Sequence, residues 1–283
     1  MAFVDFDELK ISTQTIIADT GIPMDIEDIF ARVSVDNDVS GVGGADWMSL
    51  VDTVRIKAMY YKEQTVVSEG YNFKKRSRFF RNALNVILCI GGTKMINFKL
   101  SKNGKFQLTG CKDAGHAKAS VVAFLRRVHA VCGCLPPTMT VVIQTVMTNV
   151  DFNTGHAINR TILDDNMNRL TPFFSLLETS FGYTGVNIKI PVPQDYWRTL
   201  DVPVITIEEG SRIKEETRFL GDVLQAQDRQ KVMSKPKYNT FLVFHSGNII
   251  MSGMCPQVMR GDYKILTGLL TEWRGQITEK MLE

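Results

Sequence analysis

The chain has 283 residues, 44% of them hydrophobic and 22% charged, which is ordinary for a globular protein with one large core or two coupled domains. Its net charge of +3 excludes strong bulk attraction to nucleic acid, so any such function must depend on where the charges lie. Apolar runs are too short to span a bilayer and MAFVDFDELK lacks the pattern of a signal peptide. We therefore expect a soluble intracellular protein.

The first half of the chain predicts a strand and a helix, then a hairpin, then a second helix. QTIIADTGIPMDIEDIFARV (14–33) has an apolar strand, a polar break and a helix-like segment. MINFKL (95–100) is rich in strand-forming residues, and Asn103-Gly104 after it predicts a tight turn. AGHAKASVVAFLRRVHAVC (114–132) then has one apolar face at helical spacing.

Two segments interrupt this pattern. Residues 35–78 begin rich in Gly and Asp and predict a helix around WMSLVDTVRIKAMYY (47–61). Residues 191–237 begin with prolines, contain the strand-like VPVITIEE (202–209) and continue with a charged, helix-like RIKEETRFLGDVLQAQDRQK (212–231). Both are expected to be insertions.

The second half repeats the order of elements in the first. QTVMTNVDFNTGHAINRTIL (144–163) parallels 14–33, the strand NTFLVF (239–244) parallels 95–100, and the helical VMRGDYKILTGLLTEWRG (258–275) parallels 114–132. The octapeptide NGKFQLTG (103–110) has a near twin in SGNIIMSG (246–253), with both pairs of glycines 143 positions apart. This order indicates two tandem copies of one unit in a pseudo-symmetric molecule.

The duplicated hairpins resemble those of the TATA-box-binding protein family. NVILCIGGTKMINFKLSKNGKFQLTGCKDAGHAKASVVAFLRRV (85–128) and FLVFHSGNIIMSGMCP (241–256) are similar to its repeats, which carry an apolar run, a Phe, a turn with Gly, alternating residues and Thr-Gly. Gln14-Thr15 and Gln144-Thr145 fall where the family has Gln-Asn. The resemblance implies an α+β saddle of two repeats, residues 1–135 and 136–283, with a curved antiparallel sheet under helices.

The same resemblance implies a function. It is that of a transcription initiation factor, not an enzyme, that rides on the minor groove of double-stranded DNA and recruits a transcription factor IIB-like protein and RNA polymerase machinery. The loop enlarged by residues 191–237 would lie where the IIB-like partner docks in the family. Enlarged loops are what we expect of a protein encoded by a large DNA virus, acting in the nucleus, viral factory or virion. No cofactor and no small-molecule substrate is expected.

Alternation along the strands separates helix-covered side chains from those on the free face, which the resemblance assigns to DNA. The candidates in the first half are Thr15, Ile17, Asn85, Ile87, Asn97, Lys99, Lys105, Gln107 and Thr109. Those in the second half are Thr145, Met147, Asn149, Tyr183, Lys189, Leu242, Phe244, Asn248, Ile250 and Ser252. Phe244 has the spacing of a family wedge residue that unstacks bases; Tyr183, or alternatively Phe181, is its partner, and Lys189 would meet phosphate.

The first half departs from the family pattern. A turn one residue longer than that of the family places Leu100 at the wedge position, but Asn97 and Lys99 would then face the helices. A turn two residues longer instead buries Ile96, Phe98 and Leu100 and leaves Asn97 and Lys99 on the free face, which avoids burying a lysine. We prefer the second register. Either way the first-half wedge pair is lost, with Ala83 at the other Phe position, and Thr15 and Thr145 replace two asparagines. A weaker or asymmetric bend and a relaxed TATA preference follow.

Other readings of these residues remain open. Phe244 is also typical of a half-exposed aromatic residue in a sheet, and Lys99 and Lys105 are typical of solvated charges at a sheet edge. The basic run KKRSR (74–78) is consistent with a solvated loop as well as with a phosphate anchor. Cys132 and Cys134 near His129 lack the second ligand pair of a zinc site. Asp164-Asp165 and Glu208-Glu209 are the acidic pairs a DNA-processing enzyme with this fold would use. A saddle that binds proteins and has lost DNA binding is a further alternative.

Overall fold

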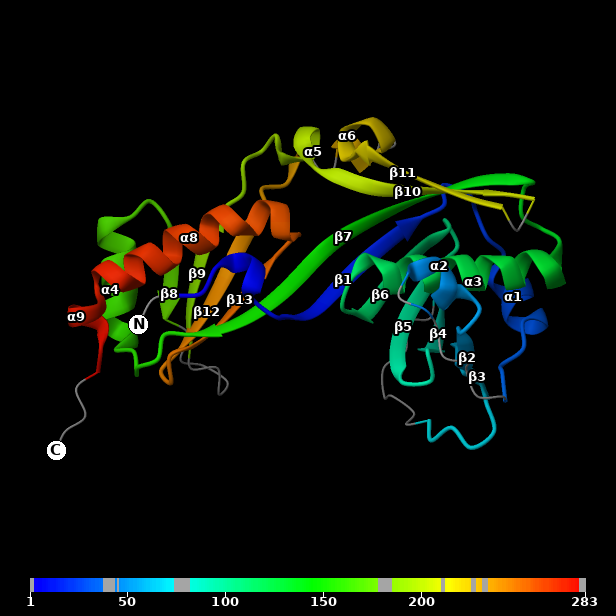
Figure 1. Ribbon diagram of the computed structural model, residues 1–283, viewed down its shortest axis with the longest axis horizontal. Coiled ribbons are helices and arrows are strands. Elements are labelled where there is room, and N and C mark those ends of the chain that lie inside the picture. Colours follow the sequence, from blue (N-terminus) through cyan, green and yellow to red (C-terminus); the bar gives the residue numbers. More distant parts are fainter. Residues whose placement is uncertain are drawn as a thin grey trace. The chain divides into compact units, whose positions relative to one another are not determined.

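The computed structural model of the chain describes residues 3–37, 44, 46–73, 82–177, 185–209, 212–224, 228–230 and 234–279. It contains two compact units (Figure 1). The N-terminal unit comprises residues 14–145 and 201–218, and the C-terminal unit comprises residues 1–13, 146–200 and 219–283. The predicted boundary after residue 135 falls ten positions before the junction at 145, while the hairpin at 201–218 joins the N-terminal unit. Among the described residues, no helix is long and apolar enough to cross a membrane.

The N-terminal unit is an antiparallel sheet with helices on one face. Its sheet order is β3-β2-β4-β5-β6-β1, and the first part of β7 pairs with β10, which pairs with β11. The strands are β1 (Ile11–Asp19), β2 (Arg55–Tyr61), β3 (Gln64–Val67), β4 (Ala83–Ile90), β5 (Lys94–Ser101), β6 (Lys105–Cys111), β7 (Thr138–Asn153), β10 (Asp201–Glu208) and β11 (Arg212–Phe219). The helices are α1 (Ile26–Arg32), α2 (Trp47–Val51) and α3 (Ala114–Cys132).

The C-terminal unit repeats this plan with fewer strands. Its sheet order is β7-β13-β12-β9-β8, again antiparallel. Its strands besides β7 are β8 (Phe174–Leu177), β9 (Gly185–Pro191), β12 (Tyr238–Phe244) and β13 (Asn248–Gly253). Its helical elements are η1 (Phe6–Glu8), α4 (Arg160–Leu170), α5 (Tyr196–Thr199), α6 (Leu220–Val223), α8 (Pro256–Glu272) and α9 (Arg274–Ile277). The predicted α+β class with two tandem repeats is confirmed.

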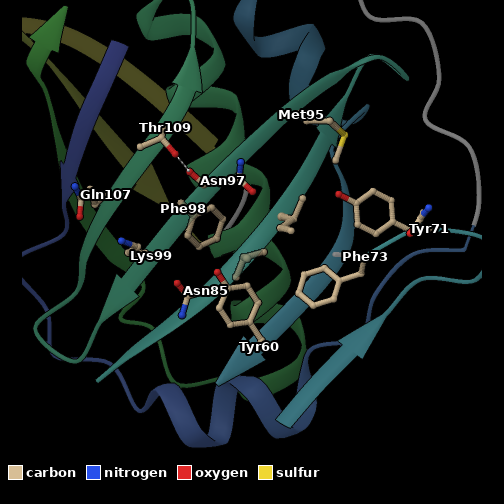
Figure 2. Close-up of a pocket in the computed structure, with 13 residues that line it drawn as sticks. Tyr60, Tyr71, Phe73, Asn85, Met95, Asn97, Phe98, Lys99, Gln107 and Thr109 are labelled. Atoms are coloured by element: carbon tan, nitrogen blue, oxygen red, sulfur yellow. Dashed lines mark hydrogen bonds between the residues drawn. The ribbon is translucent and has the colours of Figure 1, made fainter. Parts of the chain in front are cut away.

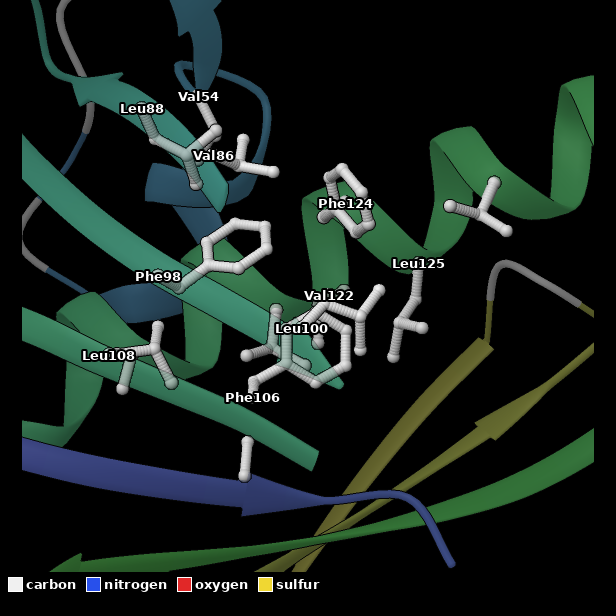
Figure 3. Close-up of a cluster of buried hydrophobic side chains, with 14 of the residues drawn as sticks. Val54, Val86, Leu88, Phe98, Leu100, Phe106, Leu108, Val122, Phe124 and Leu125 are labelled. Atoms are coloured by element: carbon white, nitrogen blue, oxygen red, sulfur yellow. The ribbon is translucent and has the colours of Figure 1, made fainter. Parts of the chain in front are cut away.

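Each unit has its own core between the sheet and its long helix. In the N-terminal unit, the rings of Phe98, Phe106 and Phe124 meet with centroids 5.0 to 6.0 Å apart, joining β5, β6 and α3 (Figure 3). In the C-terminal unit, Phe241 and Met251 of the hairpin are fully buried with Tyr263 of α8. Ile96, Phe98 and Leu100 are buried, so the preferred assignment of the first-half faces is confirmed. The longer turn predicted with it is wrong, because the hairpin turn has the same length as that of the second half.

The turn after the first strand of each repeat shows how the halves correspond. ADTGIPMD (18–25) and FNTGHAIN (152–159) are 134 positions apart. The side chains of Asp19 and Asn153 accept hydrogen bonds from the backbone N–H of the glycine two residues later, at 2.9 and 2.6 Å. Asp25 and Asn159 then cap α1 and α4. The alignment of 14–33 with 144–163 was therefore wrong by four positions.

The two hairpins have turns of the same length. The backbone N–H of Gly104 donates to the Ser101 carbonyl at 3.0 Å, and that of Gly247 donates to the Phe244 carbonyl at 3.0 Å. Both glycines have positive φ, +76° and +81°. Ser101 therefore occupies in the N-terminal unit the position that Phe244 occupies in the C-terminal unit.

The insertions differ from their predicted structures. The helix expected over 47–61 ends at Val51, and Arg55–Tyr61 form strand β2. Because β2 pairs with β4 as β8 pairs with β9, β2 belongs to the repeat and not to an insertion. In the second insertion the predicted strand is confirmed as β10, but 212–219 form strand β11 instead of a helix. β10 pairs with β7 residues 138–142, so this hairpin extends the N-terminal unit.

Glu215 fastens the inserted hairpin to the helices of the N-terminal unit. Its carboxylate accepts from the Trp47 indole N–H at 2.8 Å and from the Lys118 ammonium at 2.7 Å. That ammonium also lies 4.9 Å from the centre of the Trp47 ring. A hydrogen bond to a charged group contributes about 1.5–3 kcal/mol when water is largely excluded, and less at a partly exposed site such as this one.

Replacing Glu215 with alanine is expected to lower the free energy of unfolding by about 1–2 kcal/mol, since two donors lose their shared acceptor. The neighbouring Glu216, whose exposed carboxylate pairs with Arg218, is a matched control. Glu216→Ala should change the free energy of unfolding by less than about 0.5 kcal/mol. Chemical denaturation of both variants checks this, and equal effects would contradict the role of Glu215.

Candidate nucleic-acid interface

The nine candidates of the first half lie together on the helix-free face of the N-terminal sheet. Strand pairing aligns them in two rows across β1, β6, β5 and β4. One row is Thr15, Thr109, Asn97 and Ile87, and the next is Ile17, Gln107, Lys99 and Asn85, with Lys105 beyond them opposite Asp19. We call this surface the N-terminal free face. The grouping predicted from alternation is thus present in the structure.

The polar groups of this face differ in how they are engaged. The Lys105 ammonium forms a salt bridge with Asp19 at 3.0 Å, and the Asn85 amide donates to the Ala83 carbonyl at 3.0 Å. The Thr109 hydroxyl donates to the backbone carbonyl of Asn97 at 3.3 Å. The side-chain amides of Asn97 and Gln107 have no hydrogen-bond partner in the part of the chain that the structure describes. They are free to bind a ligand.

A pocket of about 460 Å³ opens on the N-terminal free face. Figure 2 shows the rings of Tyr60, Tyr71 and Phe73 along one side of it and the side chains of Lys99 and Gln107 along the other. The Phe73 ring lies 5.8 Å from the Tyr60 ring. Sequence reasoning missed these three aromatics, because it treated residues 35–78 as an insertion. The alternation of Ile56 to Tyr61 about a strand was the available signal.

The C-terminal free face holds most of the second-half candidates. Across β8, β9, β12, β13 and β7, pairing aligns one row, Phe174, Lys189, Thr240, Ser252 and Asn149, and a second row, Leu176, Asn187, Leu242, Ile250 and Asp151. Phe244 pairs with Gly185, and Asn248 pairs with Asn153. Met147, at 39% exposure, is two residues before Asn149. Tyr183 and Phe181, like the basic run 74–78, lie outside the described residues.

Asn149, not Thr145, is the counterpart of Thr15. Thr15 lies opposite Thr109 as Asn149 lies opposite Ser252, in hairpins that correspond at the 143-residue offset. Along β7 the buried positions change from odd numbers up to Ile143 to even numbers from Thr148, so Thr145 does not continue the alternation of Asn149. One of the two asparagines inferred to be lost is therefore present. The side-chain oxygens of Asn149 and Asn187 are buried without a hydrogen-bond partner among the described residues.

Phe244 is half-buried at the end of β12, beside an open hollow of about 650 Å³. Leu242 fills the space over Gly185, where an added Cβ would come within 2.6 Å of its side chain. The hollow is also lined by Ile250 and by the exposed carboxylate of Asp151. Phe244 thus stands at a sheet end beside Ile250, in a hollow that the polar residues Asp151, His245, Ser246 and Asn248 also line.

Three of the four carboxylates in the acidic pairs considered for catalysis have partners of their own. The Asp164 carboxylate accepts from the Ser175 hydroxyl at 2.5 Å, and Asp165 forms an ion pair with Arg169 at 3.1 Å. A hydrogen bond from the Lys214 ammonium holds the pKa of Glu208 below its usual value. Within the described ranges, no three His, Cys, Asp or Glu side chains gather as metal ligands would. Cys132 is a free thiol whose pKa burial raises to about 11.

Comparison with known proteins gives two similarities. No model of a known protein family matches the chain. It is 25% identical over 219 residues to the uncharacterized protein 335L of Invertebrate iridescent virus 6, in a match covering 73% of this chain. The chain is thus similar to a viral protein. It spans 65% of that relative's length. Among solved structures, it is similar to the TATA-binding protein of Methanococcus jannaschii, with 13% identity, a TM-score of 0.47, and 94% and 99% of the two chains covered. That structure belongs to the family which the sequence motifs resemble.

Proposed function

We propose that this protein binds duplex DNA through its two free faces, in the minor groove, and acts in transcription initiation. The observation that carries the proposal is the C-terminal free face, where Phe244 stands with Leu242 and Ile250 and where Ser252 and Asn149 supply small polar groups. A minor-groove sheet uses this chemistry, with apolar wedges to open base steps and hydroxyl and amide groups for the groove floor.

The charges on the described parts of the two free faces suit few phosphate contacts. Lys99, Lys105 and Lys189 lie on the free faces, but Lys105 is paired with Asp19 and Asp151 adds a negative charge near Phe244. Each phosphate neutralised steepens the salt dependence of binding by about one unit of logarithmic slope. We therefore expect a shallow salt dependence and a large share of the affinity from apolar contact.

The wider role is also part of the proposal. A protein that bends or marks promoter DNA requires a partner to recruit polymerase, and we propose a transcription factor IIB-like protein and the RNA polymerase machinery for that place. If the chain is virus-encoded like its relative, the nucleus, viral factory or virion is where it would act. The support for these points is the motif resemblance in the sequence.

Replacing Phe244 with alanine is expected to weaken binding to an AT-rich duplex by about five- to a hundredfold, because stacking of one aromatic ring on a base contributes about 1–3 kcal/mol. Fluorescence anisotropy with AT-rich, GC-rich and scrambled duplexes over a salt series measures this. Phe219→Ala is the control, because Phe219 is 49% exposed and lies on neither free face. It should bind as the unmodified protein does.

A folded protein that binds none of these duplexes at low salt would refute the DNA proposal. One observation would then favour a protein-docking platform. Phe174 and Leu176 on the edge strand β8 are 53% and 48% exposed, a large apolar area for solvent alone. Substitution of either residue should then abolish binding of a partner protein.

A further inference from the structure

The pocket on the N-terminal free face has a built aromatic wall. Tyr60 comes from β2, and the chain after β3 brings Tyr71 and Phe73 onto the same face (Figure 2). A turn holds this segment in place. Ser68 is buried and donates its backbone N–H to the Lys57 carbonyl at 2.9 Å, and Tyr71 donates to the Ser68 carbonyl at 3.1 Å. The wall is therefore attached to the sheet edge through the backbone.

The rest of the lining combines apolar side chains, among them Ile87 and Met95, with amide, hydroxyl and cationic groups. Strands β4 to β6 contribute Asn85, Asn97, Lys99, Gln107 and Thr109. No acidic residue lies among the described lining residues, although the chain has 30 Asp and Glu. The volume falls in the range of about 300–1,000 Å³ that is usual for pockets holding small organic groups.

These three features match one chemical group. An aromatic wall offers faces on which a heterocycle stacks, and the unpartnered amides of Asn97 and Gln107 can each donate to and accept from a base edge. The Lys99 ammonium suits a phosphate on the far side of the pocket. A base inside a continuous duplex is stacked on both faces, so it cannot also stack on the wall unless it leaves the helix.

We propose that this pocket binds one unstacked nucleotide of a DNA strand, either from single-stranded DNA or extruded from the duplex that the protein contacts. The inference rests on the proposed function only in that the protein binds DNA.

The C-terminal free face does not repeat this pocket. At the positions that correspond to Tyr60, Asn97, Lys99 and Gln107, it carries Leu176, Thr240, Leu242 and Ile250. Apolar side chains thus replace the tyrosine ring, the ammonium and the glutamine amide, and a hydroxyl group replaces the asparagine amide. Under this proposal both free faces contact DNA, and only the N-terminal free face also holds an unstacked base.

The test is binding of a short labelled single-stranded DNA by the full chain, measured by fluorescence anisotropy. Phe73→Ala and Asn97→Ala should each weaken it, Phe73→Ala by about five- to a hundredfold. Phe219→Ala and Gln257→Ala are matched controls for an exposed ring and an exposed amide outside both free faces, and they should leave binding unchanged. Circular dichroism confirms that every variant is folded.

The outcomes separate this inference from the proposed function. Single-strand binding that is absent, or equally strong in both pocket variants, overturns the inference even if duplex binding responds to Phe244→Ala. Single-strand binding that responds to Phe73→Ala supports it even if no duplex is bound in the groove. A duplex carrying 2-aminopurine reports the source: an emission change that Phe73→Ala removes and Phe244→Ala leaves in place indicates an extruded base, since a wedge at Phe244 would by itself also unstack a base. Competition by free deoxyadenosine monophosphate as strong as that by the strand overturns the assignment to a DNA strand.

Discussion

Replacing Phe98 with alanine is expected to lower the free energy of unfolding by about 3–5 kcal/mol. Phe98 is 2% exposed, and its ring packs edge-on against Phe124 at 5.0 Å and tilted against Phe106 at 5.2 Å (Figure 3). Alanine removes the apolar surface that joins β5 to α3 and leaves a cavity that the surrounding rings cannot close, because each is held by its own strand or helix.

Denaturant unfolding followed by circular dichroism measures the effect, and Phe174 provides the control. Phe174 lies on an edge strand and is 53% exposed, so Phe174→Ala should cost less than about 0.5 kcal/mol. A loss below 1 kcal/mol for Phe98→Ala would mean that the packing of this core is not as described.

Replacing Gly104 with alanine is expected to lower the free energy of unfolding by about 3 kcal/mol or more. Two costs add. A residue with a side chain at a φ of +76° costs roughly 1–2 kcal/mol. The new Cβ would also lie 2.1 Å from the Ile22 carbonyl oxygen and 2.3 Å from the Thr20 hydroxyl, so the turn after β1 must move.

Gly91 separates these two costs. It also has a positive φ, +56°, but no atom lies within 4 Å of its added Cβ. Gly91→Ala should therefore show the backbone cost alone, about 1–2 kcal/mol. Gly247→Ala should behave like Gly104→Ala, since its Cβ would meet the His156 carbonyl oxygen at 2.3 Å. Thermal or denaturant unfolding of the three variants checks the order, and equal losses for Gly91 and Gly104 would contradict the close contact.

The insertions show where prediction failed. WMSLVDTVRIKAMYY fits a helical period as well as a strand period over short stretches, and pairing with β4 decides for the strand beyond Val51. RIKEETRF has the composition of an exposed helix, yet it forms β11, because β10 presents a free edge to it and Glu215 bonds to Trp47 and Lys118. The Gln-Thr dipeptides misled the alignment of the halves, because two shared residues weigh less than the Asp-Thr-Gly and Asn-Thr-Gly turns.

The sequence by itself determined the two hairpins, the buried faces of β5, β6, β12 and β13, and the long helices after them. These are local properties, set by alternation, helical spacing and glycines whose backbone only glycine adopts readily. Only the tertiary structure decided that β2 borders β4, that β10 joins the N-terminal unit, and that Tyr60, Tyr71 and Phe73 face Asn97 and Gln107. Strands pair through backbone groups that every residue carries, so which strands become neighbours depends on the packing of the whole unit.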